Sequence, residues 1–157
     1  MLNDFLSWFS TEMAVMLTAA MPIIELRGAI PVGITLGLTP LHSAIISFIG
    51  SMIPVPFILF LIRPIFNYLK QTETFKHIVH RLIHKSNSKS DNIKKYGWIG
   101  LLIFVAIPLP GTGVWSGSLA AALLDMRFKI AFPAILVGNL IAGLLILGLS
   151  HGVLAII

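Results

Sequence analysis

Apolar positions form two long regions of the chain, separated by one strongly polar block. Residues 43–62, 130–149 and 96–124 contain no Asp, Glu, Lys or Arg. A helix of about 20 apolar residues crosses the ~30 Å hydrocarbon layer of a bilayer. The pattern therefore predicts an all-α integral membrane protein, with residues 43–62 and 130–149 as spanning helices.

The apolar segment before each predicted spanning helix is interrupted. Residues 13–24 would form only about 18 Å of helix, which is too short to cross a bilayer. Residues 99–107 rise only partway before P-L-P-G-T-G, whose prolines and glycines cannot continue a helix. We expect each segment to enter and leave the membrane on one side. The predicted re-entrant hairpins are residues 13–41 and 98–124.

Matching motifs recur in the two apolar regions. Ala20-Met21-Pro22 and Ala106-Ile107-Pro108 begin the two breaks, and Gly50-Ser51-Met52 and Gly138-Asn139-Leu140 follow about thirty residues later. We therefore expect two repeats, at 13–62 and 96–157, each a re-entrant hairpin plus one spanning helix. With the block between them in the cytoplasm, the repeats are inverted, which is a known plan of secondary transporters.

The polar block, residues 63–95, holds eight of the eleven Lys and Arg residues. The positive-inside rule places it in the cytoplasm. Apolar residues recur at helical spacing between Phe75 and Ile83, which predicts an amphipathic helix on anionic headgroups, followed by a flexible connector. His77, His80 and His84 have the spacing of metal ligands, but no carboxylate or cysteine completes a set. Headgroup contact is the favoured interpretation, and no metal or other cofactor is predicted.

Composition narrows the possible functions. The 157 residues are 57% hydrophobic and 11% charged, which argues against a soluble enzyme. The net charge of +5 lies mostly between membrane segments, so nucleic acid is not an expected partner. The absence of cysteine excludes disulfides. Residues 1–12 lack a basic n-region, which argues against a cleaved signal peptide and predicts an interfacial helix with aromatic anchors. We place the chain in the cytoplasmic membrane of a prokaryote, as a multi-pass protein.

Two charged residues lie inside apolar sequence. Glu25 and Arg27, in I-I-E-L-R-G-A-I-P, are the only charged residues between Glu12 and Arg63. A charge at the bilayer centre costs roughly 2.5 to 3.5 kcal/mol, so an unneeded one is not expected there. Glu25 is the first candidate for proton carriage or cation coupling, because burial raises the pKa of a carboxyl group. The alternative is a structural ion pair at the hairpin tip. Pro31, which closes the motif, is also a candidate.

The second candidate site is P-L-P-G-T-G-V-W-S-G. A glycine-rich turn that leads into a helix from about Val114 presents free backbone N–H groups and the positive end of the helix dipole, which bind anions. The alternative is a tight turn that lets helices pack. The candidate binding residues in this segment are Pro108, Pro110, Gly111, Thr112, Gly113, Trp115 and Ser116.

Polar residues also occupy the middle of both predicted spanning helices. Ser51 and Asn139 stand at matching places, where a polar side chain needs a partner or lines a cavity. A hydrogen bond between helices is the favoured interpretation, and both are kept as candidate binding residues. Pro54-Val55-Pro56 is expected to kink the first spanning helix next to Ser51.

The pairing of E-L-R-G-A-I-P with P-L-P-G-T-G-V-W-S-G resembles the putative small multidrug export protein family, over nearly the whole chain. A looser similarity to the DedA superfamily implies opposed re-entrant hairpins and, for several members, translocation of polyprenyl-phosphate carriers or other lipids. By this resemblance Glu25 matches the acidic position of the first hairpin. DedA proteins carry arginines around the proline-glycine turn, where this chain has Ala106 and Gly113, and Arg27 is a candidate replacement.

The leading hypothesis is a non-enzymatic transporter that exports or flips an amphipathic substrate, driven by protons or another cation. An anionic lipid would use Arg27 and the loop amides, and a cationic drug would use Glu25. One alternative is a non-transporting membrane organiser or lipid-binding protein. A remote alternative is an intramembrane serine protease using Ser116 and His151, although Val114 stands where its motif needs glycine. Membrane lipids are expected partners. A homodimer could form through small residues, namely Gly138, Ala142, Gly143 and Gly148.

Overall fold

The computed structural model describes residues 2–69, 90–109 and 111–154, and these residues contain helices and no strand. The helices are α1 (Leu2–Ala20), α2 (Glu25–Thr35), α3 (Pro40–Met52), α4 (Pro54–Leu69), α6 (Ser90–Ala106), α7 (Val114–Leu123) and α8 (Phe128–Leu154). The all-helical expectation is therefore confirmed for the described part of the chain. The predicted amphipathic segment with His77, His80 and His84 lies outside the described residues.

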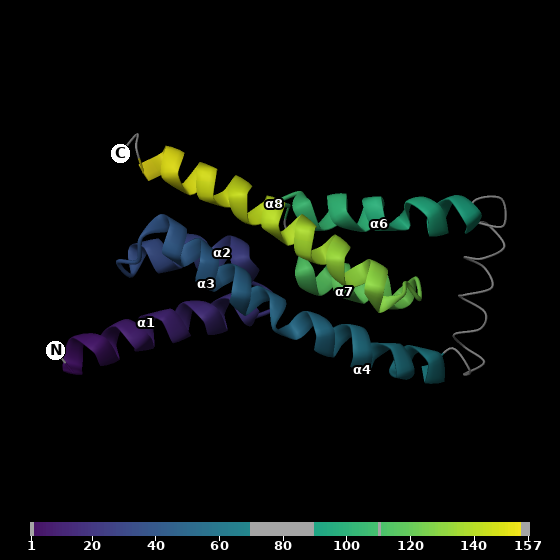
Figure 1. Cartoon of the computed structure of the whole chain (residues 1–157), viewed down its shortest axis with the longest axis horizontal. Helices are drawn as coiled ribbons and strands as arrows, with labels where there is room; N and C mark the ends of the chain where they lie inside the picture. The colour runs from purple at the N-terminus through teal and green to yellow at the C-terminus, as the bar shows by residue number, and fades with distance from the viewer. Residues whose placement is uncertain (1, 70–89, 110, 155–157) are drawn as a thin grey trace.

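The helices form two hairpins and two long elements. Figure 1 shows the α1–α2 hairpin and the α6–α7 hairpin approaching from opposite ends, with their tips meeting near the middle of the molecule. The α3–α4 pair and α8 run along the length of the molecule and flank both tips. Helix α1 packs on α3, α6 packs on α8, and α4 packs on α7. Residues more than 80 positions apart in sequence thus meet at one central place.

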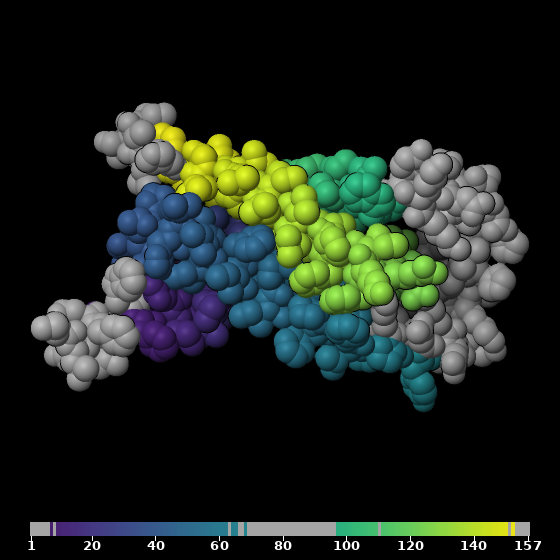
Figure 2. Space-filling model, in the orientation of Figure 1, coloured from purple at the N-terminus to yellow at the C-terminus, as the bar shows by residue number. Residues whose placement is uncertain are grey.

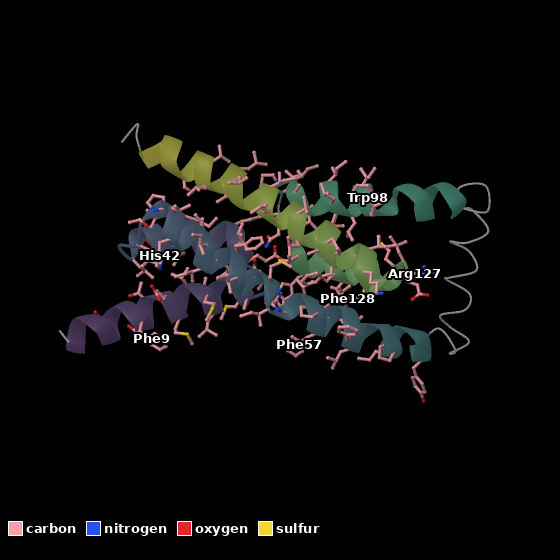
Figure 3. The ribbon with its side chains drawn as sticks, viewed as in Figure 1. Phe9, His42, Phe57, Trp98, Arg127 and Phe128 are labelled. Carbon is pink, nitrogen blue, oxygen red and sulfur yellow. The ribbon has the colours of Figure 1, made fainter. Side chains whose placement is uncertain are left out.

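Within the described residues, two elements are long and apolar enough to cross a membrane. These are Pro40–Ile62, which includes α3 and most of α4, and Phe128–Ser150 in α8, each of 23 residues with mean hydropathy 2.4. Large apolar side chains stand on the outside, including Phe57 at 62% exposure and Leu144 at 61%, and Figure 3 shows Phe57 on the outer side of α4. Such a surface suits lipid rather than water.

Proline sets the break between α3 and α4. The helix is interrupted at Ile53, and α4 begins at Pro54, whose missing N–H cannot continue the hydrogen-bond ladder of α3. Proline is well tolerated in the first turn of a helix, so Pro54 and Pro56 end one helix and start the next. The kink predicted beside Ser51 is confirmed.

The predicted hairpin breaks are confirmed to the residue at their start. Helix α1 ends at Ala20, before Pro22, and α6 ends at Ala106, before Pro108. The first helix of this hairpin was predicted to continue to residue 24, but the structure ends α1 at Ala20, begins α2 at Glu25 and confines the tip to residues 21–24. The reason is that a single proline interrupts one turn, after which residues 25–35 hydrogen-bond as a helix again.

The structure also differs from the sequence prediction at its first helix. Residues 1–12 were expected to form a separate interfacial helix, whereas α1 runs unbroken through position 12. No proline or glycine stands between positions 2 and 20. The polar side chains bond within the helix, since Thr11 Oγ1 donates to Ser7 O at 2.9 Å and Thr18 Oγ1 to Ala14 O at 2.7 Å. The polar residues therefore do not interrupt the helix.

The other long elements extend beyond their predicted ends. Helix α4 continues to Leu69 and α6 starts at Ser90, so both edges of the predicted 63–95 linker are helical. Helix α8 continues to Leu154, past the predicted end of its span at 149. The polar residues at these edges mark where an apolar surface stops, and they do not by themselves end a helix.

The second helix of each hairpin ends in the same way. At the end of α2, Leu38 N bonds Gly33 O at 3.0 Å, and Gly37 has φ +94°. At the end of α7, Met126 N bonds Ala121 O at 2.9 Å, and Asp125 has φ +52°. Both are Schellman endings with a left-handed residue, which Gly adopts freely and Asp tolerates.

The glycines at the matched motifs allow close helix contact. A Cβ at Gly50 would lie 2.4 Å from Met16 O of α1, and a Cβ at Gly138 would lie 2.6 Å from Leu102 O of α6. Each glycine therefore lets a long helix touch the first helix of its own hairpin. The next residues, Ser51 and Asn139, are both buried and join α3 to α8, because Asn139 Nδ2 donates to Ser51 Oγ at 2.8 Å. The helix–helix hydrogen bond predicted from the sequence is present.

Two apolar clusters support the tips. One lies among α4, α6, α7 and α8, and the other among α1, α2, α3 and the α2–α3 turn. Figure 2 shows α8 lying against α3, which closes the space between the two hairpins on that face. The first cluster consists of Val55, Leu59, Leu101, Val105, Val114, Ala121, Ala131, Ala134 and Ile135, and the second of Val15, Ala19, Ala29 and Leu38.

Candidate functional site

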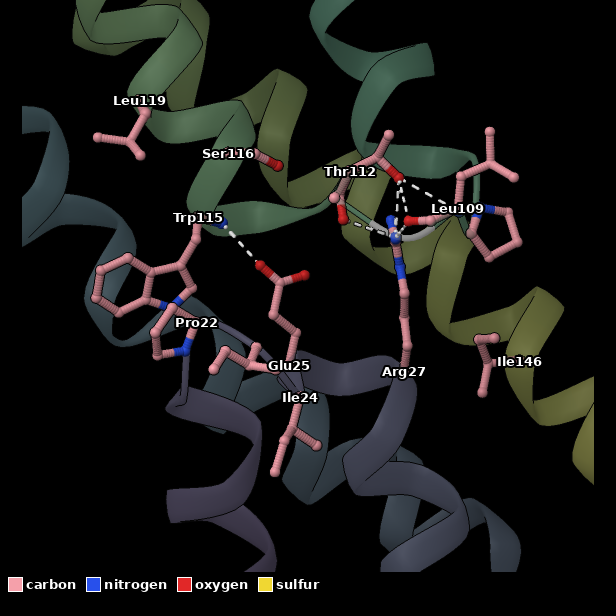
Figure 4. A pocket seen from close by; sticks show the side chains of 13 residues that line it. Pro22, Ile24, Glu25, Arg27, Leu109, Thr112, Trp115, Ser116, Leu119 and Ile146 are labelled. Carbon is pink, nitrogen blue, oxygen red and sulfur yellow. Dashed lines mark hydrogen bonds between the residues drawn. The ribbon is translucent and has the colours of Figure 1, made fainter.

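A cavity of about 520 Å³ lies where the two hairpin tips meet. It is bounded by the tip of the α1–α2 hairpin, the 107–113 loop, the start of α7 and one residue of α8 (Figure 4). Its walls are mostly apolar. The polar side chains that line it are those of Glu25, Arg27, Thr112 and Ser116, and the indole of Trp115 adds one N–H group. The lining residues are Pro22, Ile23, Ile24, Glu25, Arg27, Pro108, Leu109, Gly111, Thr112, Trp115, Ser116, Leu119 and Ile146.

Arg27 ties the first hairpin to the backbone of the second. Its Nη2 donates to Val105 O at 3.1 Å and to Ile107 O at 3.0 Å. Its Nη1 donates to Thr112 O at 2.6 Å, to Thr112 Oγ1 at 2.8 Å and to Leu109 O. One guanidinium group therefore contacts four backbone carbonyls and one hydroxyl across the gap between the tips (Figure 4).

The need for this contact follows from the break in α6. The last turn of a helix leaves carbonyl groups without helical partners, and the negative end of the helix dipole lies there. Arg27 supplies the donors and a compensating positive charge, so it caps α6 from another hairpin.

Glu25 meets the opposite end of the same break. Its side chain is 7% exposed, and its Oε1 accepts a hydrogen bond from Trp115 N at 3.1 Å. The amide of Val114 also faces the carboxylate. Both amides belong to the first turn of α7, where free N–H groups and the positive end of the dipole attract an anion. The carboxylate of Glu25 therefore occupies the anion site that the glycine-rich turn was predicted to form.

Backbone conformation makes room for that carboxylate. Gly113 precedes α7 with φ +144°, a region that side chains rarely adopt. A Cβ at Gly113 would lie 1.8 Å from Glu25 Oε2. Glu25 itself has φ +52°, so it is a left-handed residue at the very start of α2. Both unusual conformations serve the same contact between the tips.

Trp115 adds a third bond between the hairpins. Its indole Nε1 donates to Ala20 O, the last residue of α1, at 3.0 Å. The same residue thus offers its backbone N–H to Glu25 and its side-chain N–H to the end of α1. These two bonds fix the indole ring against the cavity beside Pro22 (Figure 4).

Thr112 holds the 107–113 loop in shape. Its Oγ1 lies 2.7 Å from Ile107 O and 2.9 Å from Leu109 O, either of which can accept its single proton. The same oxygen accepts from Leu109 N at 3.3 Å and from Arg27. The loop is therefore organised around one hydroxyl and one guanidinium group.

Comparison with known proteins gives a family. The family model described as "Putative small multi-drug export protein" matches residues 25–145. This chain belongs to that family. The description of the family as export proteins is consistent with a membrane transporter. No curated protein and no solved structure matches the chain. The similarity to the DedA superfamily is not shown by these comparisons.

The family match begins at Glu25 itself, so it includes both charged residues of the cavity and the whole of the 107–113 loop. Most residues singled out in the sequence of this export family member come together at the cavity. Glu25 and Arg27 do not bond each other among the recorded contacts, so a direct ion pair is not what holds the tip. The predicted residues that line the cavity are Glu25, Arg27, Pro108, Gly111, Thr112, Trp115 and Ser116, with Gly113 buried beside Glu25.

Other predicted residues lie elsewhere. Ser51 and Asn139 bond each other and are not among the residues that line the cavity. Pro31 lies inside α2 and is likewise not among them. Pro110 is outside the described residues. Ser116 Oγ lies 3.5 Å from Gly113 O, at the limit of a hydrogen bond.

Sequence reasoning missed part of the apolar wall. The first tip contributes three of these residues, Pro22, Ile23 and Ile24. Their position beside a predicted helix break could have identified them as lining residues. Leu119 lies one helical turn after Trp115, so helix periodicity could have found it. Ile146 of α8 had no local signal, because only the packing of α8 on α2 brings it there.

Proposed function

We propose that this chain is a small exporter or flippase for an amphipathic substrate, which binds in the cavity between the hairpin tips. One observation carries the proposal. The two charged residues of an otherwise apolar segment, Glu25 and Arg27, both lie at a largely apolar cavity that is bounded by helix breaks from two hairpins. Broken helices that meet around a central site are the usual architecture of secondary transporters.

In this proposal the hairpins are re-entrant and the two repeats are inverted. The opposite approach of the hairpins supports this arrangement, as do their matched Schellman endings and the paired roles of Gly50 and Gly138. Rocking of one hairpin against the other would open the cavity to each side in turn. The Ser51–Asn139 bond lies between equivalent positions of the two repeats, where relative motion is smallest.

Glu25 is the coupling residue of the proposed transporter. Its carboxylate bonds the start of α7, so its charge state bears directly on the contact between the tips. A proton or another cation that binds Glu25 removes or offsets the negative charge. The hydrogen bond from Trp115 N then weakens, since a charged acceptor binds an N–H group about twice as strongly as a neutral one. Cation binding and release of the tips are thereby linked.

The test is transport into proteoliposomes that contain the purified chain. We expect Glu25→Gln to lose coupled transport, because the amide is isosteric with the carboxyl but carries no charge. Glu12→Gln is the matched control, since Glu12 is the other carboxylate of this region and bonds His42 at 2.7 Å outside the cavity. Full coupled transport by a folded Glu25→Gln variant would disprove the coupling role.

The serine protease alternative gains no support from the site. Ser116 Oγ is directed at a backbone carbonyl, and none of the described residues that line the cavity is a histidine. Among the described residues there is also no cluster of three metal-binding side chains.

A further inference from the structure

We infer that the substrate of this cavity is a lipophilic cation rather than a lipophilic anion. The inference rests on the proposed transport function and adds the charge of the substrate. Two observations support it. The groups at the cavity that would bind an anion are already hydrogen-bonded within the protein, whereas the group that would bind a cation is not fully used. The aromatic and apolar walls also suit a lipophilic cation.

Arg27 has little capacity left for an anion. A guanidinium group has five N–H donors, of which the two Nη atoms carry four. Those four face five acceptors, namely the carbonyls of residues 105, 107, 109 and 112 and the hydroxyl of Thr112. Among the described residues, the Nε–H alone has no partner within hydrogen-bond distance. A phosphate that took over the Nη groups would leave the carbonyls of residues 105, 107, 109 and 112 without these donors.

The other natural anion site is filled as well. The first turn of α7 bonds the carboxylate of Glu25, so its amides are engaged by an anion that belongs to the protein. A second anion there would displace Glu25 or stand beside its negative charge. Either arrangement is unfavourable, because like charges repel strongly where the dielectric constant is low.

Glu25 keeps acceptor capacity for a cation. A carboxylate offers about four lone-pair positions. Trp115 N takes one on Oε1, and the amide of Val114 also faces the group. Arg27 attracts Glu25 electrostatically but does not hydrogen-bond it, because its Nη donors bind the carbonyls and the hydroxyl of the 105–112 segment. A ligand with positive charge can therefore pair with the remaining lone-pair positions of Glu25 and offset its charge, which weakens the hydrogen bond from Trp115 N without replacing it.

The walls of the cavity suit a cation with an apolar body. The indole of Trp115 is held in place by its bond to Ala20 O, and the face of a Trp ring attracts cations. Ile23, Ile24, Leu119 and Ile146 supply apolar surface around it. The volume of about 520 Å³ lies within the range of sites for drug-sized ligands.

The experiment measures equilibrium binding to the full chain in lipid nanodiscs. Tetraphenylphosphonium is the lipophilic cation, and geranylgeranyl phosphate is the lipophilic anion. We expect the cation to bind, the anion to bind more weakly, and Glu25→Gln to weaken cation binding about tenfold or more. Glu12→Gln should bind the cation as the unchanged chain does.

A second variant keeps the test decisive if Glu25→Gln fails to fold. Ile146→Trp fills part of the cavity from α8 without touching any recorded hydrogen bond, and it should weaken cation binding. Its matched control is Leu144→Trp, also on α8, because Leu144 is 61% exposed and does not line the cavity. That control should leave binding unchanged.

Tighter binding of geranylgeranyl phosphate than of tetraphenylphosphonium would overturn the inference. Cation binding that survives both Glu25→Gln and Ile146→Trp would do the same. Transport of both compounds in proteoliposomes separates this inference from the proposed function. Cation binding at the cavity without transport would contradict the exporter and leave the inference standing, whereas transport of the phosphate alone would do the reverse.

Discussion

The tip of the α1–α2 hairpin is residues 21–24, whereas the tip of the α6–α7 hairpin is residues 107–113. In the first tip the backbone satisfies itself, through bonds such as Glu25 N to Met21 O at 3.1 Å and Gly28 N to Ile24 O at 3.1 Å. In the second, carbonyls from residue 105 to residue 112 accept donors from Arg27 instead. The first hairpin receives one side-chain donor from the other, from Trp115 Nε1 to Ala20 O, whereas the second receives five hydrogen bonds from Arg27.

This asymmetry explains where the charged residues stand in the sequence. The open loop needs a cation at the end of α6 and an anion at the start of α7. The compact tip provides both, two residues apart, as Arg27 and Glu25. The second hairpin therefore needs no charge of its own between Tyr96 and Leu124. The first hairpin thus supplies both charged side chains, and the second supplies the backbone groups that they bind.

The largest expected effect comes from removing the donor of this contact. Arg27→Met leaves several carbonyls without partners, and we expect a loss of roughly 3 kcal/mol or more in the free energy of unfolding. Thermal unfolding of the purified protein measures it. Arg27→Lys should recover only part of the loss, because an ammonium lacks the planar fork. Arg127→Gln, at an exposed position, is the control, and equal stability of Arg27→Met and Arg127→Gln would refute the capping role.

A smaller loss of stability is expected from changes at the contact between Glu25 and the start of α7. Gly113→Ala places a methyl group against Glu25 Oε2, whereas Gly111→Ala, also at positive φ (+82°), meets no heavy atom within 4 Å. Both substitutions also strain the backbone, and the strain is larger at Gly113, whose φ of +144° and ψ of −164° lie in a region that is essentially confined to glycine. Gly113→Ala should lose more stability than Gly111→Ala and should also weaken tetraphenylphosphonium binding, because Glu25 is displaced. The same loss in both variants would show that Glu25 does not depend on this space.

The smallest loss of stability is expected at the hydrogen bond between Ser51 of α3 and Asn139 of α8. A double-mutant cycle of Ser51→Ala and Asn139→Ala should give a coupling energy of about 0.6 kcal/mol, typical of hydrogen bonds between membrane helices. Ser118→Ala is the control, since Ser118 Oγ bonds Val114 O in its own helix and should not couple to Asn139. A coupling of zero for the first pair would mean that the buried bond does not stabilise the contact of α3 with α8.

Much of the fold could be predicted because helix breaks have local causes. Pro22, Pro54 and Pro108 each mark an observed interruption, and the start of α7 at Val114 follows from the glycines before it. Polar residues were a poorer guide to boundaries. α1 passes through Glu12 and α4 passes beyond Arg63, because a charged side chain on a helix surface does not disturb the backbone bonds.

The sequence by itself determined that the chain is an all-helical membrane protein, where its helices break, and that Glu25, Arg27 and the 107–113 loop are exceptional. These features depend on local chemistry, namely apolar run length, proline, glycine and the cost of a buried charge. Only the tertiary structure decided that Glu25 binds the start of α7, that Arg27 caps the end of α6, and that Ile146 completes the cavity. Those contacts join residues about 80 to 120 positions apart, and no local pattern specifies which distant backbone groups a side chain will meet.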